Sequence, residues 1–334
     1  MNTDVKFDLK NAKKKIIIGA DGGGTKTKLA AADGEGNILG CCSCGGINYN
    51  YDNIEQCRLN LKSGIENLLK SIGAPDYDYL SAGLCALSEA ATDEEKKFFC
   101  GDVFDPDKIL LQSDVHMALT GAFPLSDGVM AVSGTGTMCV AKKDGKTLVS
   151  GGWGYLLGDE GSCYYIAWRG VIGAARYSDG IGERTSITEA LKEYCNIKDV
   201  RDIIPLIYAQ PIDVGKIAGF APCVIQCFRE GDAVAERIVS DALGVLTKTV
   251  SRLIEKFDLK NGAVGMYGGL FEHNPDIASR FCAEMKGVYP AFTVDFPEFE
   301  PELGAIIYYF AENGVLTEDI LGRIRATKKN MRYT

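Results

Sequence analysis

The sequence predicts an α/β protein that contains two related domains. Short apolar strands alternate with helical patterns along the chain, which is typical of a layered α/β fold. A strand, a glycine-rich turn, a second strand and an Asp-Gly turn open the chain, and the same order returns about 112 positions later, with Thr137 in the place of Thr25. The length of 334 residues also suits two domains. No low-complexity linker separates the halves, so we expect a hinge and a cleft between them.

The spacing of apolar residues predicts the elements of each half. In the first half, strands are expected at 15–21, 27–33, 37–45, 79–87 and 108–114, and helices within 51–72 and 92–100. In the second half, we expect three strands within 127–152, a long helix at 232–258, a strand that ends at Gly268 and Gly269, and helices near 302–313 and 317–329.

Composition excludes several classes of protein. The net charge is -9, which argues against a general nucleic-acid binder. The polar N-terminal segment lacks the apolar core of a signal peptide, and no run approaches the roughly 18 apolar residues of a membrane span. We therefore expect a cytoplasmic protein that has neither nucleic acid nor a membrane as its partner.

The twelve cysteines are expected to be reduced thiols. In the stretch CCSC, Cys42 and Cys44 share one face of a predicted strand and Cys41 takes the other. No cluster of His and Cys follows at zinc spacing. Cys223 and Cys227 have helical spacing and are expected to pack in a core.

The two glycine-rich turns match neither common phosphate motif. A P-loop needs a lysine directly after its last glycine and then a helix, whereas Thr25 intervenes here and a strand follows. The Rossmann pattern lacks its third glycine. Each turn is therefore a tight hairpin, which is either an ordinary turn or a nest of amides that binds an anion. Two hairpins at matching places favour the phosphate-binding interpretation.

Three carboxylates stand at places where chemistry is expected. Asp21 ends the first strand and either binds Mg²⁺ that accompanies a nucleotide or caps a turn. Asp114 ends a buried strand, where ligands bind in open α/β sheets, and is also a candidate helix N-cap. Asp159 follows four glycines and precedes a predicted helix, which suits either ligand binding or helix capping. His116 and His273 lack triad partners and are interpreted as structural.

These motifs resemble those of the N-acetylglucosamine kinase and BadF/BadG/BcrA/BcrD-type ATPase family, in the hexokinase–actin–heat-shock chaperone superfamily. The stretch 19–33 is similar to that superfamily's first phosphate motif, 131–141 to its second and 267–273 to its adenosine-side glycine motif. The segment 151–170 is similar to the one that holds the sugar in amino-sugar kinases. The resemblance extends from about residue 15 to about residue 312.

The resemblance implies a role for each matching position. Asp21 belongs to the metal side, Asp114 is the catalytic base, and Gly268 and Gly269 lie against adenine and ribose. The first phosphate loop contains Gly23, Gly24, Thr25, Lys26 and Thr27, and the second contains Gly134, Thr135, Gly136 and Thr137. The sugar contacts are Asn48, Asp114, Gly152, Trp153, Gly154 and Asp159.

The resemblance also implies a fold and an activity. The fold is α/β, with two RNase-H-like (actin-like ATPase) domains around a central cleft: one at 15–117, with a C-terminal helix at about 303–330 that packs back on it, and a larger one at 118–302. The implied activity is an ATP- and Mg²⁺-dependent kinase that phosphorylates the 6-hydroxyl of N-acetylglucosamine or N-acetylmuramic acid. The substrate partner is thus a small amino sugar, and a homodimer is left open.

Alternatives remain at this point. The chain departs from the mammalian kinases at Met138 and Cys163, which leaves the sugar open, glucosamine included. Activators of 2-acyl-CoA dehydratases share the fold and carry an iron–sulfur cluster, but they hold no sugar, and this sequence shows no clear pair of cluster cysteines. A sugar sensor without catalysis is disfavoured by the presence of both Asp21 and Asp114.

Overall fold

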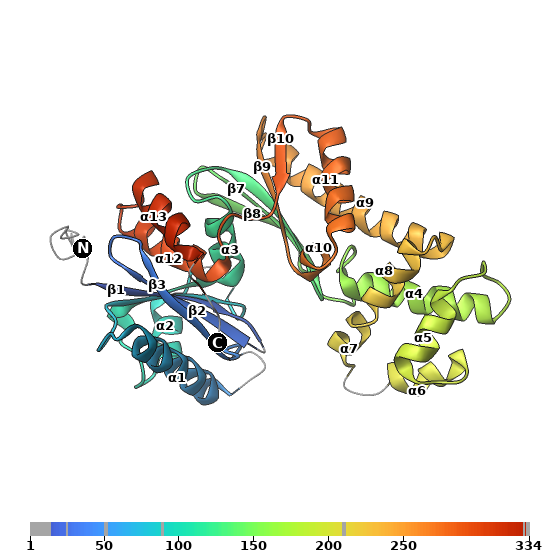
Figure 1. The fold of residues 1–334 in the computed structure, drawn as a ribbon, viewed down its shortest axis with the longest axis horizontal. Helices are drawn as coiled ribbons and strands as arrows, with labels where there is room; N and C mark the ends of the chain where they lie inside the picture. Colours follow the sequence, from blue (N-terminus) through green and yellow to red (C-terminus); the bar gives the residue numbers. More distant parts are fainter. Residues whose placement is uncertain are drawn as a thin grey trace. The chain divides into compact units, whose positions relative to one another are not determined.

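The structure is a computed structural model that describes residues 15–24, 26–49, 53–87, 90–208, 212–329 and 331. The chain divides into two compact units. The first extends to Leu125 and resumes at Pro297, and the second is Ser126–Phe296. Each unit contains one five-stranded sheet (Figure 1).

The first sheet has the order β3-β2-β1-β4-β5. Its strands are β1 (Ile16–Gly22), β2 (Lys26–Asp33), β3 (Ile38–Gly45), β4 (Tyr79–Leu84) and β5 (Ile109–Ser113). The first three strands are antiparallel neighbours, and β4 and β5 continue the sheet parallel to β1. The carboxyl ends of β1, β4 and β5 therefore lie at the same edge of this sheet.

Helices cover both faces of the first sheet because its strands bury side chains on both sides. Ile18 packs with α1 (Ile54–Ile72) and α2 (Asp93–Cys100), while its neighbour Ile17 packs with the C-terminal helices. Those helices are α12 (Pro301–Glu312) and α13 (Glu318–Lys328), and α12 also packs on α3 (Asp114–Ala122). A Cβ on Gly19 of β1 would stand 2.1 Å from the Glu302 carbonyl oxygen, so α12 lies directly on the central strand.

The second sheet repeats the topology of the first. Its order is β10-β9-β6-β7-β8, from β6 (Gly128–Ser133), β7 (Thr137–Lys143), β8 (Lys146–Gly151), β9 (Gly262–Tyr267) and β10 (Phe292–Asp295). The strands β6, β7 and β8 are antiparallel neighbours, and β9 and β10 are parallel to β6. Both sheets thus have the RNase-H-like arrangement that the resemblance implies, and the predicted α/β class is confirmed.

The strand pairing corrects one detail of the repeat. Thr137 pairs with Ser133 at the end of β6, and the residue that pairs with Gly22 at the end of β1 is Thr27. The counterpart of Thr137 is therefore Thr27, two residues beyond the predicted Thr25, which lies outside the described residues. The equivalence was misplaced because glycine and threonine occur at several neighbouring positions in both turns.

Helices make up most of the rest of the second unit. They are α4 (Cys163–Ser178), α5 (Ile187–Cys195), α6 (Ile204–Ile207), α7 (Val214–Ala218), α8 (Ala221–Arg229), α9 (Ala233–Lys256), α10 (Gly269–Glu272) and α11 (Pro275–Val288). The long helix α9 begins after its N-cap Asp232 and buries the predicted apolar stripe against β6, β7 and β8. The Asp232 carboxylate accepts hydrogen bonds from Val234 and Ala235, which satisfies two otherwise free helix amides.

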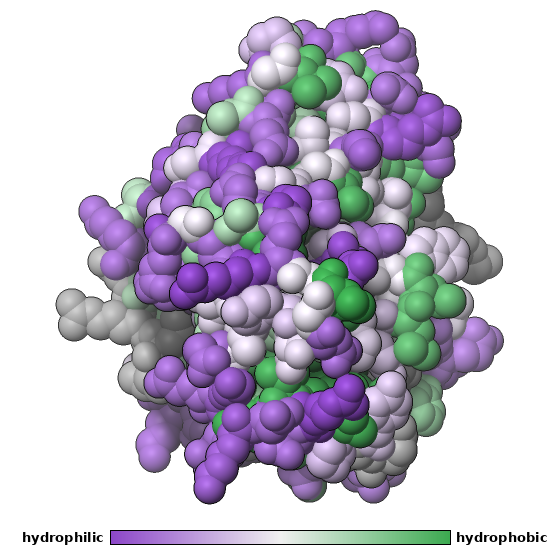
Figure 2. Space-filling model, turned by 90° about the vertical axis from the view of Figure 1, so that its right-hand side faces the viewer, coloured by the Kyte–Doolittle hydropathy of each residue, from purple (hydrophilic) through white to green (hydrophobic). Residues whose placement is uncertain are grey.

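The surface of the second unit is mainly hydrophilic over its helices, as expected when the helices bury their apolar sides. Figure 2 shows mainly hydrophilic residues on the face that carries these helices, with hydrophobic residues in smaller groups between them. Cys223 and Cys227 pack in the core cluster of this unit, as their spacing predicts. Among the residues that the structure describes, no helix is long and apolar enough to cross a membrane.

Candidate active site

The first glycine-rich hairpin joins β1 to β2 beside the carboxyl end of β4. A Cβ on Gly22 would stand 2.6 Å from the Gly83 carbonyl oxygen, and one on Gly23 would stand 2.6 Å from the Lys26 carbonyl oxygen. Both positions therefore require glycine. Gly24 is exposed, and the Asn48 amide nitrogen lies 3.9 Å from where its Cβ would stand. The structure thus brings the predicted sugar-binding Asn48 next to the predicted phosphate loop.

The two side chains after the turn differ in exposure. Lys26 is exposed, whereas Thr27 is fully buried and its hydroxyl has no hydrogen-bond partner among the described residues. The side chain of Thr27 faces the interior of the unit in this structure, so only its backbone is placed near the turn. The phosphate contacts predicted for this hairpin remain predictions.

Asp21 is a largely buried carboxylate at the end of β1. Burial raises the pKa of Asp21 to about 6, while the Lys28 ammonium lowers it and the Asp114 carboxylate raises it further. Lys28 stands directly across from Asp21 in the β1–β2 ladder, so the two side chains share a face of the sheet. The energetic cost of burying the Asp21 carboxylate is therefore only partly offset by the Lys28 ammonium.

Asp114 is the first residue of α3, directly after β5. Ser113 is the N-cap and accepts a hydrogen bond from His116, so the alternative that Asp114 caps this helix is wrong. The Asp114 carboxylate accepts a hydrogen bond of 2.7 Å from the Val115 amide. Burial raises the pKa of Asp114, and the Val115 hydrogen bond lowers it in part.

A glycine between the two aspartates makes room for this arrangement. Gly83 pairs with Asp21 across β1 and β4, and a Cβ on Gly83 would stand 2.9 Å from the Asp114 Cα. Gly83 therefore lets the start of α3 lie directly against β4, with the Met117 side chain packed at the same point. Asp21 and Asp114 are close enough for their charges to interact.

Glu302 is a third carboxylate that sequence reasoning missed. Its side chain is fully buried on α12, and neither carboxylate oxygen has a hydrogen-bond partner among the described residues. Burial raises the pKa of Glu302 to about 7, its own backbone N–H and the Lys28 ammonium lower it, and Asp21 and Glu300 raise it. In the sequence, Pro-Glu-Leu-Gly reads only as a helix start, because nothing local indicates that α12 lies on β1 beside Lys28.

The second hairpin joins β6 to β7 and is tied to the start of α4. The Gly134 and Thr135 carbonyls accept hydrogen bonds from the Cys163 and Tyr164 amides at 2.8 and 3.3 Å. Nothing lies within 4 Å of the point where a Cβ on Gly134 would stand, so this glycine borders open space. The turn is therefore held by α4 while one side of it stays open to a ligand.

Asp159 supports this second hairpin directly. Its carboxylate accepts a hydrogen bond of 3.1 Å from the Thr137 amide and lies 3.0 Å from where a Cβ on Gly136 would stand. Asp159 itself has a φ of 59°, which costs energy in a residue other than glycine. The predicted sugar-binding Asp159 and the predicted second phosphate loop are thus one connected structure.

The glycine pair after β9 lies against the same hairpin. β9 is parallel to β6, so residues that follow the two strands meet at one edge of the sheet. Gly268 has a φ of 100°, and a Cβ there would stand 2.5 Å from the Ser133 carbonyl oxygen. Gly269 begins the short helix α10. Gly268 is therefore required both for its backbone conformation and for the close approach of the two loops.

A cavity of about 590 Å³ opens where these loops meet α7 and α8. It contains three of the predicted nucleotide-binding residues, Gly134, Thr135 and Gly269. The other lining residues were missed by sequence reasoning: Cys163, Gly215, Ala218, Gly219, Ala221, Pro222, Ile225, Arg229, His273 and Asn274. The helices α7 and α8 bring small and apolar residues to a wall that no motif marks. His273, interpreted as structural from sequence, borders this cavity.

The segment between β8 and α4 owes its glycine density to backbone conformation. Gly151, Gly152, Gly154 and Gly161 all have a positive φ. Trp153 is 71 % exposed, and Leu156 and Leu157 beside it are also exposed. The Met138 sulfur lies 3.3 Å from where a Cβ on Gly152 would stand, so the predicted departure at Met138 touches this segment. An exposed tryptophan on a glycine-rich loop can stack on a sugar ring.

Metal-binding side chains are sparse in the part of the chain that the structure describes. No group of three or more His, Cys, Asp or Glu side chains is placed to hold a metal ion there. Cys42 and Cys44 share a face of β3 and pack toward α1, while Cys41 packs on the other face, as predicted. A protein-only metal cage is therefore not a feature of the described residues.

The fold and the two glycine hairpins define a protein of the actin-like ATPase class, and comparisons give the family. The BadF/BadG/BcrA/BcrD ATPase family model matches residues 18–308, so the chain belongs to that family. The predicted family is thereby confirmed.

Two curated relatives and one solved structure show what the chain is similar to. It is 28 % identical over 300 residues to an N-acetylmuramic acid/N-acetylglucosamine kinase of Clostridium acetobutylicum, covering 88 % of this chain and 97 % of that protein. It is 27 % identical over 320 residues to an N-acetyl-D-glucosamine kinase of Dictyostelium discoideum, with the same coverage. A Chromobacterium violaceum structure, provisionally assigned as an N-acetylglucosamine kinase, matches with a TM-score of 0.71 at 21 % identity, over 88 % of this chain and 98 % of that one. The last match supports the fold.

Proposed function

We propose that the chain is an ATP-dependent kinase that phosphorylates the 6-hydroxyl of an N-acetylated amino sugar. The observation that carries the proposal is the cavity of about 590 Å³ that joins the second hairpin to the glycine pair after β9. A nucleotide needs a place for its phosphates next to a place for its base. The relatives in Clostridium and Dictyostelium, which are kinases of such sugars, support the same activity.

The second unit supplies the nucleotide site in this proposal. The turn from Gly134 to Thr137 holds the phosphates with the backbone amides of Thr135 and Gly136, since amides bind anions without a side chain. The Gly134 and Thr137 amides already donate to the Gly136 carbonyl and the Asp159 carboxylate. Gly268 and Gly269 lie against the ribose and adenine, and the apolar residues of α8 contact the base. Cys163, with a pKa raised by burial to about 11, stays a neutral thiol in this wall.

Asp114 acts as the general base in this proposal. It removes the proton of the sugar hydroxyl while that oxygen attacks the γ-phosphorus of ATP, and the bond to the β–γ bridging oxygen breaks to release ADP. Burial raises the pKa of Asp114, which makes its carboxylate a stronger base than an exposed aspartate. Most of the acceleration in phosphoryl transfer comes from positioning and charge neutralisation.

The residues around Asp21 fit a Mg²⁺ ion that arrives with the nucleotide. The Asp21 carboxylate is buried beside Asp114, and the Glu302 carboxylate close by has no hydrogen-bond partner among the described residues. Mg²⁺ is usually held by one or two carboxylates, water and substrate phosphates, so the absence of a larger cage among those residues is compatible with it. When bound, the ion neutralises phosphate charge, and Asp21 fixes it.

The sugar contacts in this proposal come from Asn48, Asp114 and the loop from Gly152 to Asp159. The exposed indole of Trp153 provides a flat apolar surface, and the amide of Gly154 suits the oxygen of an acetamido group. The Gly152 amide already donates to the Thr137 carbonyl, so Gly152 contacts the sugar through the rest of its backbone. A site built on hydrogen bonds rejects a sugar that lacks them more strongly than an apolar pocket does. N-acetylglucosamine is therefore the expected substrate, ahead of glucose and glucosamine, while N-acetylmuramic acid stays open.

A panel of sugars tests this function. Purified protein with ATP and Mg²⁺ should release ADP with N-acetylglucosamine or N-acetylmuramic acid, and kcat/KM for glucose and glucosamine should be clearly lower. A preference for glucose or glucosamine would overturn the acetamido assignment and retain the kinase. No ADP release with any hexose or amino sugar would overturn the kinase itself and return attention to the dehydratase-activator alternative.

Two further expectations remain proposals. We propose that the two compact units are the two domains of the kinase, with the C-terminal helices as part of the first. We also keep the homodimer as a hypothesis, which light scattering on the purified protein would decide.

A further inference from the structure

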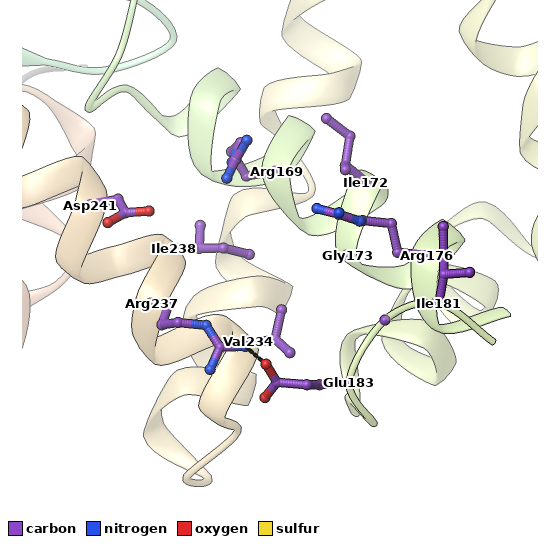
Figure 3. A pocket seen from close by; sticks show the side chains of 11 residues that line it. Arg169, Ile172, Gly173, Arg176, Ile181, Glu183, Val234, Arg237, Ile238 and Asp241 are labelled. Atoms are coloured by element: carbon purple, nitrogen blue, oxygen red, sulfur yellow. Dashed lines mark ion pairs between the residues drawn. The ribbon is translucent and has the colours of Figure 1, made fainter. Parts of the chain in front are cut away.

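A second cavity lies in the second unit, at the other end of α4 from the phosphate hairpin. Its volume is about 370 Å³, and it is bordered by the last turns of α4, the first half of α9 and the segment 181–183 (Figure 3). This volume is roughly ten times the 30 Å³ or so that one water occupies in the liquid. The cavity is therefore large enough for a small organic molecule.

Three arginines border this cavity. Arg169 and Arg176 stand two turns apart on α4, and Arg237 faces them from α9. Figure 3 shows the side chain of Arg176 extending from α4 toward the space between the two helices, with Arg169 and Arg237 on other sides of that space. Guanidinium groups present several N–H donors in a plane, which matches the oxygens of a phosphate or carboxylate.

The charge at this cavity is only partly balanced by the protein. Arg237 forms an ion pair of 2.9 Å with Glu183, and Asp241 is the other carboxylate at the cavity. Neither Arg169 nor Arg176 forms an ion pair with any residue that the structure describes; Arg169 lies 6.0 Å above the Tyr165 ring. The cavity therefore has an excess of positive charge, in a protein whose net charge is -9.

The wall opposite the helices is fixed at both of its ends. The amides of Ile181 and Gly182 donate hydrogen bonds of 3.0 and 2.9 Å to the Arg176 carbonyl. A few residues later, the Ser186 amide donates to the carboxylate of Asp232, the N-cap of α9. The segment that carries Glu183 is thus held against both helices, and the cavity is a built feature and not the edge of a loose loop.

We propose that this cavity is a binding site for a small phosphate-bearing anion. Arg176 and Arg169 contact the phosphate oxygens, and the side chains of Ile172, Ile181 and Ile238 border the part of the molecule that carries no charge. The site is separate from the cavity at Gly134 and Gly269, with which it shares no lining residue. The proposal does not depend on the identity of the sugar that the protein phosphorylates.

Two sources of the ligand share this chemistry: inorganic phosphate and a phosphomonoester of a sugar. Titrations with inorganic phosphate and with glucose 6-phosphate distinguish them. Tighter binding of glucose 6-phosphate would show that the apolar wall contributes and that the ligand is an ester. Equal affinity would show that the phosphate group alone is recognised.

Calorimetric titration of the full-length protein tests the site itself. Because the nucleotide site also binds phosphate, the titration is done with a non-hydrolysable ATP analogue and Mg²⁺ at saturation. We expect one remaining phosphate site in the wild type, and we expect Arg176→Gln and Arg169→Gln each to weaken it at least about tenfold, since a hydrogen bond to a charged group is worth about 1.5–3 kcal/mol.

The matched control is Arg252→Gln, which removes an arginine from the exposed surface of the same α9 helix that carries Arg237. This variant should bind phosphate like the wild type. Circular dichroism confirms that each variant is folded, and Arg176→Lys, which keeps the charge, is expected to retain more affinity than Arg176→Gln. The proposal is overturned if the wild type shows no second site, or if both glutamine variants bind phosphate as tightly as the control.

Discussion

The strand ends of the two sheets carry opposite chemistry although their topology is the same. In the first unit, the ladder next to the turn pairs Asp21 with Lys28, and a second aspartate follows β5. At the corresponding place in the second unit, Val132 pairs with Met138. Here the strand ends carry glycines and border an open cavity, and the carboxylate near them, Asp159, accepts a hydrogen bond from the turn itself. In the function that we propose, one topology serves two tasks: the first unit holds carboxylates for metal and proton chemistry, and the second holds backbone amides for phosphates.

The largest expected effect comes from Asp114, which we propose as the general base. Asp114→Asn keeps the size of the side chain and removes the base, so we expect kcat to fall by about 10²–10⁴. The measurement is ADP release at saturating sugar and ATP. The exposed Asp107, before the same strand β5, gives the control Asp107→Asn, which should keep normal turnover.

The pH dependence of the same reaction provides a second test of Asp114 as the general base. Burial raises the pKa of Asp114, so its base form is lost at a higher pH than for an exposed aspartate. The wild-type rate should therefore decline on the acid side at a pH above the usual aspartate range near 4. The residual rate of Asp114→Asn should lose the part of that decline that is due to Asp114, while a decline due to Asp21, whose pKa is raised to about 6, remains. A variant with near-normal turnover, or an unchanged acid limb, would remove Asp114 from the proton transfer.

A substitution at Gly268 tests whether glycine is required where the loop after β9 approaches the second hairpin. Alanine there would force a Cβ to within 2.5 Å of the Ser133 carbonyl, in a backbone conformation with a φ of 100°. Overpacking costs about 1–3 kcal/mol, and the Gly268 backbone, with a ψ of 165°, is in a region nearly confined to glycine that costs other residues about 1–3 kcal/mol. We therefore expect the free energy of unfolding to fall by about 2–6 kcal/mol.

Chemical denaturation measures the effect of Gly268→Ala. Gly145→Ala is the matched control, because Gly145 also has a positive φ of 74° but nothing lies within 4 Å of its added Cβ. The free energy of unfolding of Gly145→Ala should fall only by the cost of its backbone conformation, without the cost of overpacking. Equal losses in both variants would show that the contact between Gly268 and the hairpin is unimportant.

The buried carboxylate of Glu302 predicts a stability that depends on pH. Its pKa is raised from 4.5 in the unfolded chain to about 7 in the folded one, so the folded state binds more protons between these values. The free energy of unfolding should therefore decrease as pH rises through this window, by about 3 kcal/mol in total. Glu302→Gln should remove this decrease.

The measurement is denaturation of the wild type and Glu302→Gln at pH 5 and pH 8, without nucleotide or metal. The variant should gain stability relative to the wild type at pH 8 and much less at pH 5. Asp21, whose pKa is also raised, is present in both proteins and contributes equally. A variant that is less stable than the wild type at pH 8 would mean that the Glu302 carboxylate is well compensated.

Local sequence patterns predicted the parts of the fold that depend on local rules. The apolar strands, the long helix α9 and the repeated hairpins follow from the spacing of apolar residues and glycines. The short edge strand β10 was missed because four residues are too few for its alternation of apolar and polar side chains to stand out. The N-cap of α3 was misassigned between two adjacent capping residues, Ser113 and Asp114.

The candidate site was predicted less completely, because much of it depends on contacts distant in sequence. Asp21 and Asp114 could be found because each follows a strand that ends at the same sheet edge. Glu302 could not, since its burial results from α12 lying on Gly19, nearly the whole chain away. The cavity wall of α7 and α8 is composed of small residues without a motif, so only the folded chain shows that they meet Gly134 and Gly269.

Calorimetric titration of a non-hydrolysable ATP analogue, with Mg²⁺, tests the division between the two units most directly. Gly134→Val fills the open space at the second hairpin and should weaken nucleotide binding at least about tenfold, whereas Asp114→Asn should bind within about twofold of the wild type. The opposite result, with nucleotide affinity lost in Asp114→Asn and retained in Gly134→Val, would contradict the account.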